Sequence, residues 1–130
     1  MALSVADQLE IQQLYANYNH AIDFGRGAEW AATFTPDGVF NSGQGTFTGT
    51  EQLQGFVAGF AAQLKARHWT NNLVVDGDGA KASGACYLLL WRLQAGAAPS
   101  VLVSGVYHDE LAKTADGWRF TSRRVAPDAV

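Results

Sequence analysis

Two side chains of this sequence, Asp23 and His68, have the types needed to move a proton without a cofactor. Asp23 closes a helical pattern near the N-terminus, and His68 opens the first long strand pattern. Imidazole titrates near neutral pH without help, so His68 is a candidate general base. A carboxylate on Nδ1 would orient the ring and stabilise the imidazolium that forms, while Nε2 takes a proton from a substrate. We interpret the two residues as a candidate catalytic dyad.

Each member of this candidate dyad also has an ordinary explanation. Asp23 is an acid near the C-terminal end of a helix, where the helix dipole disfavours it, and Gly25 follows as a turn signal, so it fits an exposed surface acid. A helical wheel places Asp23 off the apolar stripe, so it reaches a pocket only if the helix ends or bends there. His68 fits a hydrogen-bonded histidine at a strand end. The sequence leaves both interpretations open.

Tyr18 and Arg123 are candidates for assisting the dyad. Tyr18 lies on the apolar stripe of the first helix, and its phenol can donate to a substrate oxygen. Strict strand alternation puts Phe120 and Arg123 on opposite faces of the last strand, and one of Arg123 and Arg124 is expected to point inward. The ordinary alternatives are a core tyrosine and a surface arginine whose stem covers apolar surface.

Aromatic side chains are plentiful for a chain of 130 residues, with four Trp, four Tyr and seven Phe. Such rings build both protein cores and the walls of ligand pockets. We predict that a substrate pocket is walled by Tyr15, Trp30, Phe34, Phe56, Phe60, Trp69, Tyr87 and Trp91.

No motif for a metal or a cofactor is evident. His108 precedes two acids, but no second histidine shares a ligand spacing with it. The Asp-Gly-Asp-Gly run at 76–79 lacks the glutamate that closes a calcium loop, and a hairpin turn explains it better. The sequence has neither a dinucleotide fingerprint nor a P-loop. Cys86, the sole cysteine, fits a small buried hydrophobe. We expect neither metal nor cofactor.

Composition narrows the partners and the compartment. The net charge is −3 and Arg123-Arg124 is the only basic cluster, which argues against nucleic acid. No stretch approaches the roughly 20 apolar residues of a membrane span, and no basic segment precedes an apolar run as in a signal peptide. We therefore expect a cytoplasmic protein that binds a small apolar molecule, with residues 1–130 forming one domain.

The predicted elements place helices first and strands later. The spacing of Ile11, Leu14, Tyr15, Tyr18 and Ile22 predicts a helix that Ser4 caps and Gly25 stops. Further elements are predicted as a short helix at 28–34, a hairpin at 39–49, a helix at 50–64 capped by Thr50, and strands at 68–75, 80–94, 101–111 and 118–125. This order predicts an α+β fold in which three helices cover a curved antiparallel sheet, forming a cone that encloses one apolar pocket.

Three segments carry a family resemblance. They are Glu10 to Asp23, Arg67-His68-Trp69-Thr70-Asn71-Asn72-Leu73, and Gly117-Trp118-Arg119-Phe120. The pattern resembles SnoaL-like proteins of the NTF2-like superfamily over nearly the whole chain. Within them it is most similar to the branch that includes hexachlorocyclohexane dehydrochlorinase and bile acid 7α-dehydratase.

The resemblance implies roles for four residues. It matches Asp23 and His68 to a His–Asp dyad that removes a proton, Arg123 to an arginine of the last strand, and Tyr18 to a tyrosine five residues before the aspartate. The dehydrochlorinase lysine of the first helix has no clear match in the segment 17–20. The resemblance does not identify the substrate.

Two classes of function follow. The favoured one is a cofactor-independent lyase or isomerase, of dehydratase or dehydrochlorinase type, acting on a small, mostly apolar and possibly cyclic substrate. The alternative is a non-catalytic ligand-binding domain or a structural subunit with the same fold. The outer face of a long antiparallel sheet needs a cover, so we expect a homo-oligomer, either a dimer or a trimer.

Overall fold

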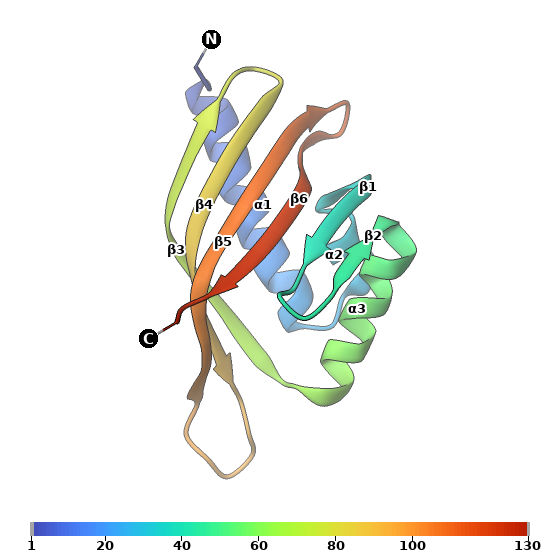
Figure 1. The fold of residues 1–130 in the computed structure, drawn as a ribbon, viewed down its shortest axis with the longest axis vertical. Helices are drawn as coiled ribbons and strands as arrows, with labels where there is room; N and C mark the ends of the chain where they lie inside the picture. The colour runs from blue at the N-terminus through green and yellow to red at the C-terminus, as the bar shows by residue number, and fades with distance from the viewer. Residues whose placement is uncertain (1, 130) are drawn as a thin grey trace.

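A computed structural model describes residues 2–129, which form three helices and six strands (Figure 1). The helices are α1 (Val5–Asp23), α2 (Gly27–Ala31) and α3 (Gly49–Gln63). The strands are β1 (Phe34–Asn41), β2 (Thr46–Thr48), β3 (Ala66–Gly77), β4 (Lys81–Arg92), β5 (Ser100–Thr114) and β6 (Gly117–Pro127). None of the described helices combines the length and the apolar character that crossing a membrane requires.

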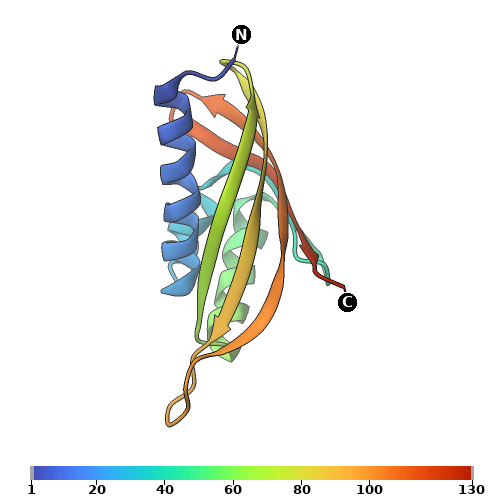
Figure 2. The ribbon, with the colours of Figure 1, turned by 90° about the vertical axis from the view of Figure 1, so that its left-hand side faces the viewer.

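All six strands join one curved sheet in the order β2-β1-β6-β5-β4-β3. α1 runs along one face of this sheet, and α2 and α3 lie beside β1 and β2 (Figure 2). The predicted α+β fold with N-terminal helices on a curved sheet is thereby confirmed. The prediction of a wholly antiparallel sheet was wrong in one place, because β1 runs parallel to β6. Strands β3 to β6 form the predicted antiparallel meander.

α1 follows its sequence pattern closely. Ser4 Oγ accepts from the backbone N–H of Asp7, and the Asp7 carboxylate accepts from the backbone N–H of Ser4, which completes a capping box. The predicted apolar stripe is buried along its whole length, from Ile11 to Ile22. This stripe holds α1 against the sheet and fixes where its last residue, Asp23, must lie.

Two predicted element boundaries were wrong. α2 ends at Ala31, and Phe34 instead begins β1, where it pairs with Phe120 of β6. Pro36 lies at an irregularity in that strand, where a residue without an N–H group is tolerated. α3 begins at Gly49 with Thr48 as its N-cap, so the predicted cap Thr50 lies inside the helix.

The interior of the cone beside α2 and α3 is filled by aromatic rings. Trp30 is fully buried, and its ring centroid lies 5.2 Å from Phe34, 5.3 Å from Phe40 and 5.6 Å from Phe56. The centroid of the Tyr18 ring lies 5.3 Å from that of the indole. Tilted and edge-to-face pairs of this kind stabilise a core beyond the area that they bury. This half of the cone is therefore core rather than cavity.

Asp7 joins the start of α1 to the β5–β6 hairpin. Trp118 Nε1 donates to Asp7 Oδ1 at 2.9 Å, and Lys113 Nζ lies 3.0 Å from the same oxygen. Hydrogen bonds from Trp118, then Lys113 and Ser4, hold the pKa of Asp7 well below its usual 3.8. A carboxylate whose pKa is lowered by folding stabilises the protein above its unfolded pKa, and this contribution is lost as pH falls through the folded value.

We therefore expect Asp7→Asn to lower the melting temperature near pH 7. The difference from the unsubstituted protein should shrink as the pH falls below about 4, where the unfolded carboxyl takes up its proton. Circular dichroism melts across this pH range measure the effect. The exposed Asp116 provides a matched control, and Asp116→Asn should change neither the melting temperature nor its dependence on pH. A constant difference at all pH values would contradict the assignment.

Candidate active site

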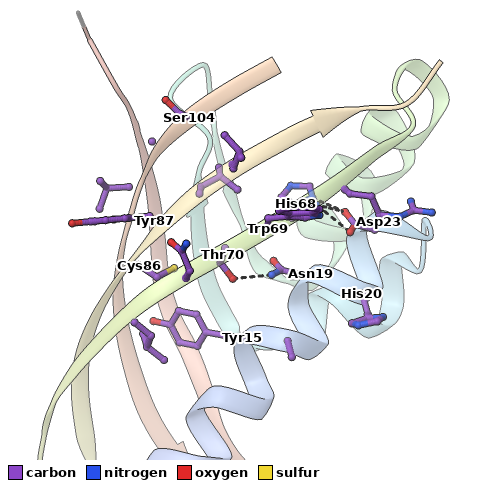
Figure 3. A pocket seen from close by; sticks show the side chains of 18 of the residues that line it. Tyr15, Asn19, His20, Asp23, His68, Trp69, Thr70, Cys86, Tyr87 and Ser104 are labelled. Atoms are coloured by element: carbon purple, nitrogen blue, oxygen red, sulfur yellow. Dashed lines mark hydrogen bonds and ion pairs between the residues drawn. The ribbon is translucent and has the colours of Figure 1, made fainter. Parts of the chain in front are cut away.

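Asp23 and His68 are in contact where α1 ends against the start of β3 (Figure 3). His68 Nδ1 lies 2.6 Å from Asp23 Oδ1, and the backbone N–H of His68 donates to both carboxylate oxygens at 3.1 Å. The two side chains are only 5% and 7% exposed. Asp23 is the last residue of α1, and although the helical wheel places it off the apolar stripe, its carboxylate reaches the start of β3. Main-chain and side-chain contacts together fix the carboxylate against the ring.

This contact sets the chemistry of the imidazole. A carboxylate at Nδ1 favours the tautomer that carries its proton on Nδ1, which leaves a lone pair on Nε2. No hydrogen bond joins Nε2 to another described residue, and the Phe60 ring packs with its centroid 5.7 Å from the imidazole. The geometry is that of a base whose reactive nitrogen is not occupied by the protein.

The Asp23–His68 pair lines a cavity of about 1120 Å³ bounded by α1, β3, β4 and β5. Side chains alternate across a strand, so the lining comes from both faces of the sheet. Asn19, Thr70 and Cys86 belong to the face that α1 covers, whereas Trp69 and Tyr87 belong to the opposite face. The latter two are 60% and 55% exposed. The cavity is thus an open groove around the edge strand β3, unlike the enclosed pocket predicted from the sequence.

The predicted wall residues divide into two groups. Tyr15, Trp69 and Tyr87 line the cavity. The other five lie outside its lining: Trp30 and Phe34 are buried in the aromatic core, Phe56 and Phe60 pack between α3 and that core, and Trp91 packs on Trp69 with centroids 5.2 Å apart.

Tyr18, predicted to assist the dyad, lies in the core. It is fully buried between Trp30, Tyr107 and Phe120 and does not line the cavity. Burial raises the pKa of its phenol to about 12, so the hydroxyl remains protonated at neutral pH. Its Oη has no hydrogen-bond partner among the described residues.

Arg123 points inward but into the core, where it is 1% exposed and outside the lining of the groove. Its Nε donates to Asp109 Oδ1 at 2.9 Å, and its guanidinium carbon lies 3.5 Å from the centroid of Tyr107. The alternation that separated Arg123 from Phe120 was wrong. Glu110 pairs with Ser122 while Leu111 pairs with Phe120, so the intervening Thr121 forms a β-bulge. The bulge brings the side chains of Phe120 and Arg123 to the same inward face.

Asp109 is a buried neighbour of the site that the sequence analysis did not single out. It accepts from Arg123 and, through Oδ2, from the hydroxyl of Tyr15, whose ring lines the cavity. Burial and the nearby Asp109 raise the pKa of Tyr15 well above its usual value, so the phenol stays a donor. A Cβ on Gly84, the cross-strand partner of Asp109, would collide with Tyr15 Oη. The sequence signal that could have found it is strand alternation, which places Asp109 on the same inward face as Tyr107 and Leu111.

The remaining candidates behave as ordinary structural residues. Cys86 is buried, and its burial raises the pKa of the thiol to about 11, which keeps it neutral. His108 is exposed, as predicted, opposite the buried Tyr107. Within residues 2–129 no group of three or more His, Cys, Asp or Glu side chains is arranged to hold a metal ion.

Comparison with known proteins places this geometry in a family. Residues 4–124 match the model of the SnoaL-like domain. The structure of Rv3472, a protein of unknown function from Mycobacterium tuberculosis that was solved as a point variant, is similar to this one. It is 31% identical with a TM-score of 0.91, covering 96% of this chain and 73% of that one.

Two further structures extend the comparison. A Catenulispora acidiphila protein in complex with S-DNPA is 30% identical, with a TM-score of 0.85 and 96% of both chains covered. An NTF2-like protein with a cystatin-like fold from Novosphingobium aromaticivorans shares the fold at 22% identity and a TM-score of 0.88, covering 95% of this chain and 82% of that one. The chain therefore belongs to the family of SnoaL-like domains.

Proposed function

We propose that this protein is a cofactor-independent lyase or isomerase that begins its reaction by removing a proton from carbon. The observation that carries the proposal is the 2.6 Å contact between His68 Nδ1 and Asp23 Oδ1 at the wall of a cavity. His68 Nε2 takes the proton, and Asp23 holds the ring and stabilises the imidazolium. The electron pair released from carbon then expels a leaving group or moves into an adjacent carbonyl.

The lining of the cavity supports a small, mostly apolar and cyclic substrate. On the face that carries His68, Tyr15 offers aromatic surface, and Leu73 and Leu88 add aliphatic surface. The cavity, of about 1120 Å³ over both faces of the sheet, is ample for a small molecule. The related Catenulispora acidiphila protein, solved with S-DNPA bound, also supports a role in binding a small ligand.

A test that needs no natural substrate is hydrogen–deuterium exchange into enolisable cyclic and aryl ketones, followed by NMR in D₂O. Removing a general base costs about 10²–10⁴ in rate, so we expect His68→Ala and Asp23→Asn to slow exchange by about that factor. His20→Ala is the matched control, because His20 also lines the cavity and makes no contact with Asp23 among the described hydrogen bonds. Exchange that proceeds equally in His68→Ala would leave a non-catalytic ligand-binding domain as the better interpretation.

We also propose that a second copy of this chain covers the outer face of the sheet. Val74, Trp69, Tyr87 and Val101 are between 52% and 69% exposed, and an aromatic and aliphatic surface of this kind favours association. Light scattering coupled to size exclusion should give a mass above one chain, and Tyr87→Glu should shift it toward 13.9 kDa. A single-chain mass for the unsubstituted protein would contradict this proposal.

A further inference from the structure

A second polar pair, Asn19 and Thr70, crosses from α1 to β3 beside the Asp23–His68 pair (Figure 3). Asn19 Nδ2 donates to Thr70 Oγ1 at 2.9 Å, and both residues line the cavity. Asn19 precedes Asp23 by four residues, about 6 Å along a helix. Thr70 follows His68 by two residues, about 6.6 Å along a strand and on the same face. The matched spacings place the two pairs at adjacent levels of one wall.

The Asn19–Thr70 pair has hydrogen-bonding capacity that the protein does not use. Thr70 Oγ1 accepts from Asn19, and no described residue accepts its hydroxyl proton. Asn19 Oδ1 is buried without a partner. Turning the amide over would leave its NH₂ group unpaired instead and would direct the Thr70 hydroxyl proton to Asn19, so either orientation leaves one polar group unsatisfied and only the first leaves Thr70 a free donor. A hydrogen bond with a purely structural role would not need an unsatisfied buried group beside it, since such a group is unfavourable.

Two other polar groups near this wall are already committed. The Tyr15 hydroxyl donates to Asp109, and the Arg123 guanidinium is paired with the same carboxylate within the core. Arg123, which the sequence offered as a candidate for assisting the dyad, is therefore not placed to meet a substrate oxygen in the groove. The Thr70 hydroxyl, by contrast, is a neutral donor that lines the groove next to His68.

We propose that Thr70, oriented by Asn19, binds a carbonyl oxygen of the substrate while His68 deprotonates the neighbouring carbon. This inference rests on the proposed function and narrows its substrate class to enolisable carbonyl compounds. The C–H bond breaks and its proton goes to Nε2. Its electron pair forms the C=C bond of an enolate, and the carbonyl π electrons move to oxygen. The Thr70 hydroxyl donates to that oxygen more strongly as its negative charge develops.

Two probes of almost equal shape test this assignment: acetophenone, and α-methylstyrene, in which C=CH₂ replaces C=O. Chemical-shift titration of ¹⁵N-labelled protein gives both affinities without any need for turnover. We expect the unsubstituted protein to favour acetophenone by about tenfold, the contribution of one hydrogen bond. Thr70→Val, which keeps the shape and removes the hydroxyl, should abolish that preference. Thr70→Ser, which keeps the hydroxyl, should retain it.

The outcomes separate this inference from the proposed function. His68→Ala should retain the preference for acetophenone while losing deuterium exchange, because binding of the oxygen does not need the base. One outcome is that Thr70→Val loses the preference for acetophenone while His68→Ala keeps undiminished deuterium exchange. That pair of results would support the oxygen site at Thr70 and reject His68 as the base. Equal affinity of the unsubstituted protein for the two probes, including no measurable binding of either, would overturn the oxygen site. A preference that survives in Thr70→Val would do the same.

Discussion

Arg123→Met is expected to lower the free energy of unfolding by about 3–5 kcal/mol, the cost of removing one partner from a buried ion pair. The side chains of Arg123 and Asp109 are both fully inaccessible, with Nε and Oδ1 2.9 Å apart. Methionine fills much of the same volume but leaves the Asp109 carboxylate without its counter-charge in the core. Urea unfolding near pH 7, followed by far-UV circular dichroism, measures the loss.

Two companion variants show whether the unpaired charge is the cause. Arg124→Met changes the exposed neighbour on the same strand and should alter stability by no more than about 0.5 kcal/mol. The double variant Asp109→Leu with Arg123→Met removes both charges, and we expect it to be more stable than Arg123→Met alone. If the single and double variants unfold at the same urea concentration, electrostatics does not explain the loss.

Trp30→Ala is expected to cost about 3–5 kcal/mol, the range for truncating a large aromatic side chain in a core. Trp30 is fully buried, and four rings pack around its indole at 5.2 to 5.6 Å. These rings are held by α1, β1 and α3, so they cannot collapse together into the space that alanine leaves. The same urea experiment measures the effect.

Trp69 is the matched control for Trp30. It is 60% exposed on the outer face of the sheet, so Trp69→Ala should cost much less stability. The pair of variants thus separates core from exposed surface, a distinction that aromatic content alone did not make. Similar losses of stability from both substitutions would show that Trp69 is also part of the core.

Local patterns predicted much of the fold. The apolar stripe of α1, its capping box, the helix at α3 and the hairpin turns of the meander each depend on residues close in sequence, and each is present. The candidate pair Asp23 and His68 followed from residue types and the family resemblance. Their contact depends on α1 ending at Asp23, which Gly25 signalled.

The features that the sequence did not reveal are those that depend on strand register. The bulge opposite Glu110 and Leu111 turns Arg123 toward Phe120, and no local residue type marks it. The parallel pairing of β1 with β6 joins segments about eighty residues apart. The core role of Asp109 follows from the register of β5 on β6, which sets it opposite Arg123, and from its contact with Tyr15 of α1. Composition could suggest a pocket, but only the register decides which aromatic rings fill the core.

The place of β6 in the sheet has a consequence for synthesis on the ribosome. β6 lies between β1 and β5, and it supplies Trp118, Phe120 and Arg123 to the core. Until translation has passed β6, strands β1 and β2 cannot join the meander, because β6 lies between β1 and β5. The nascent chain then carries an unpaired edge on β1 and another on β5, the kind of edge that promotes aggregation. The sheet of this protein is therefore completed only after β6 has left the exit tunnel.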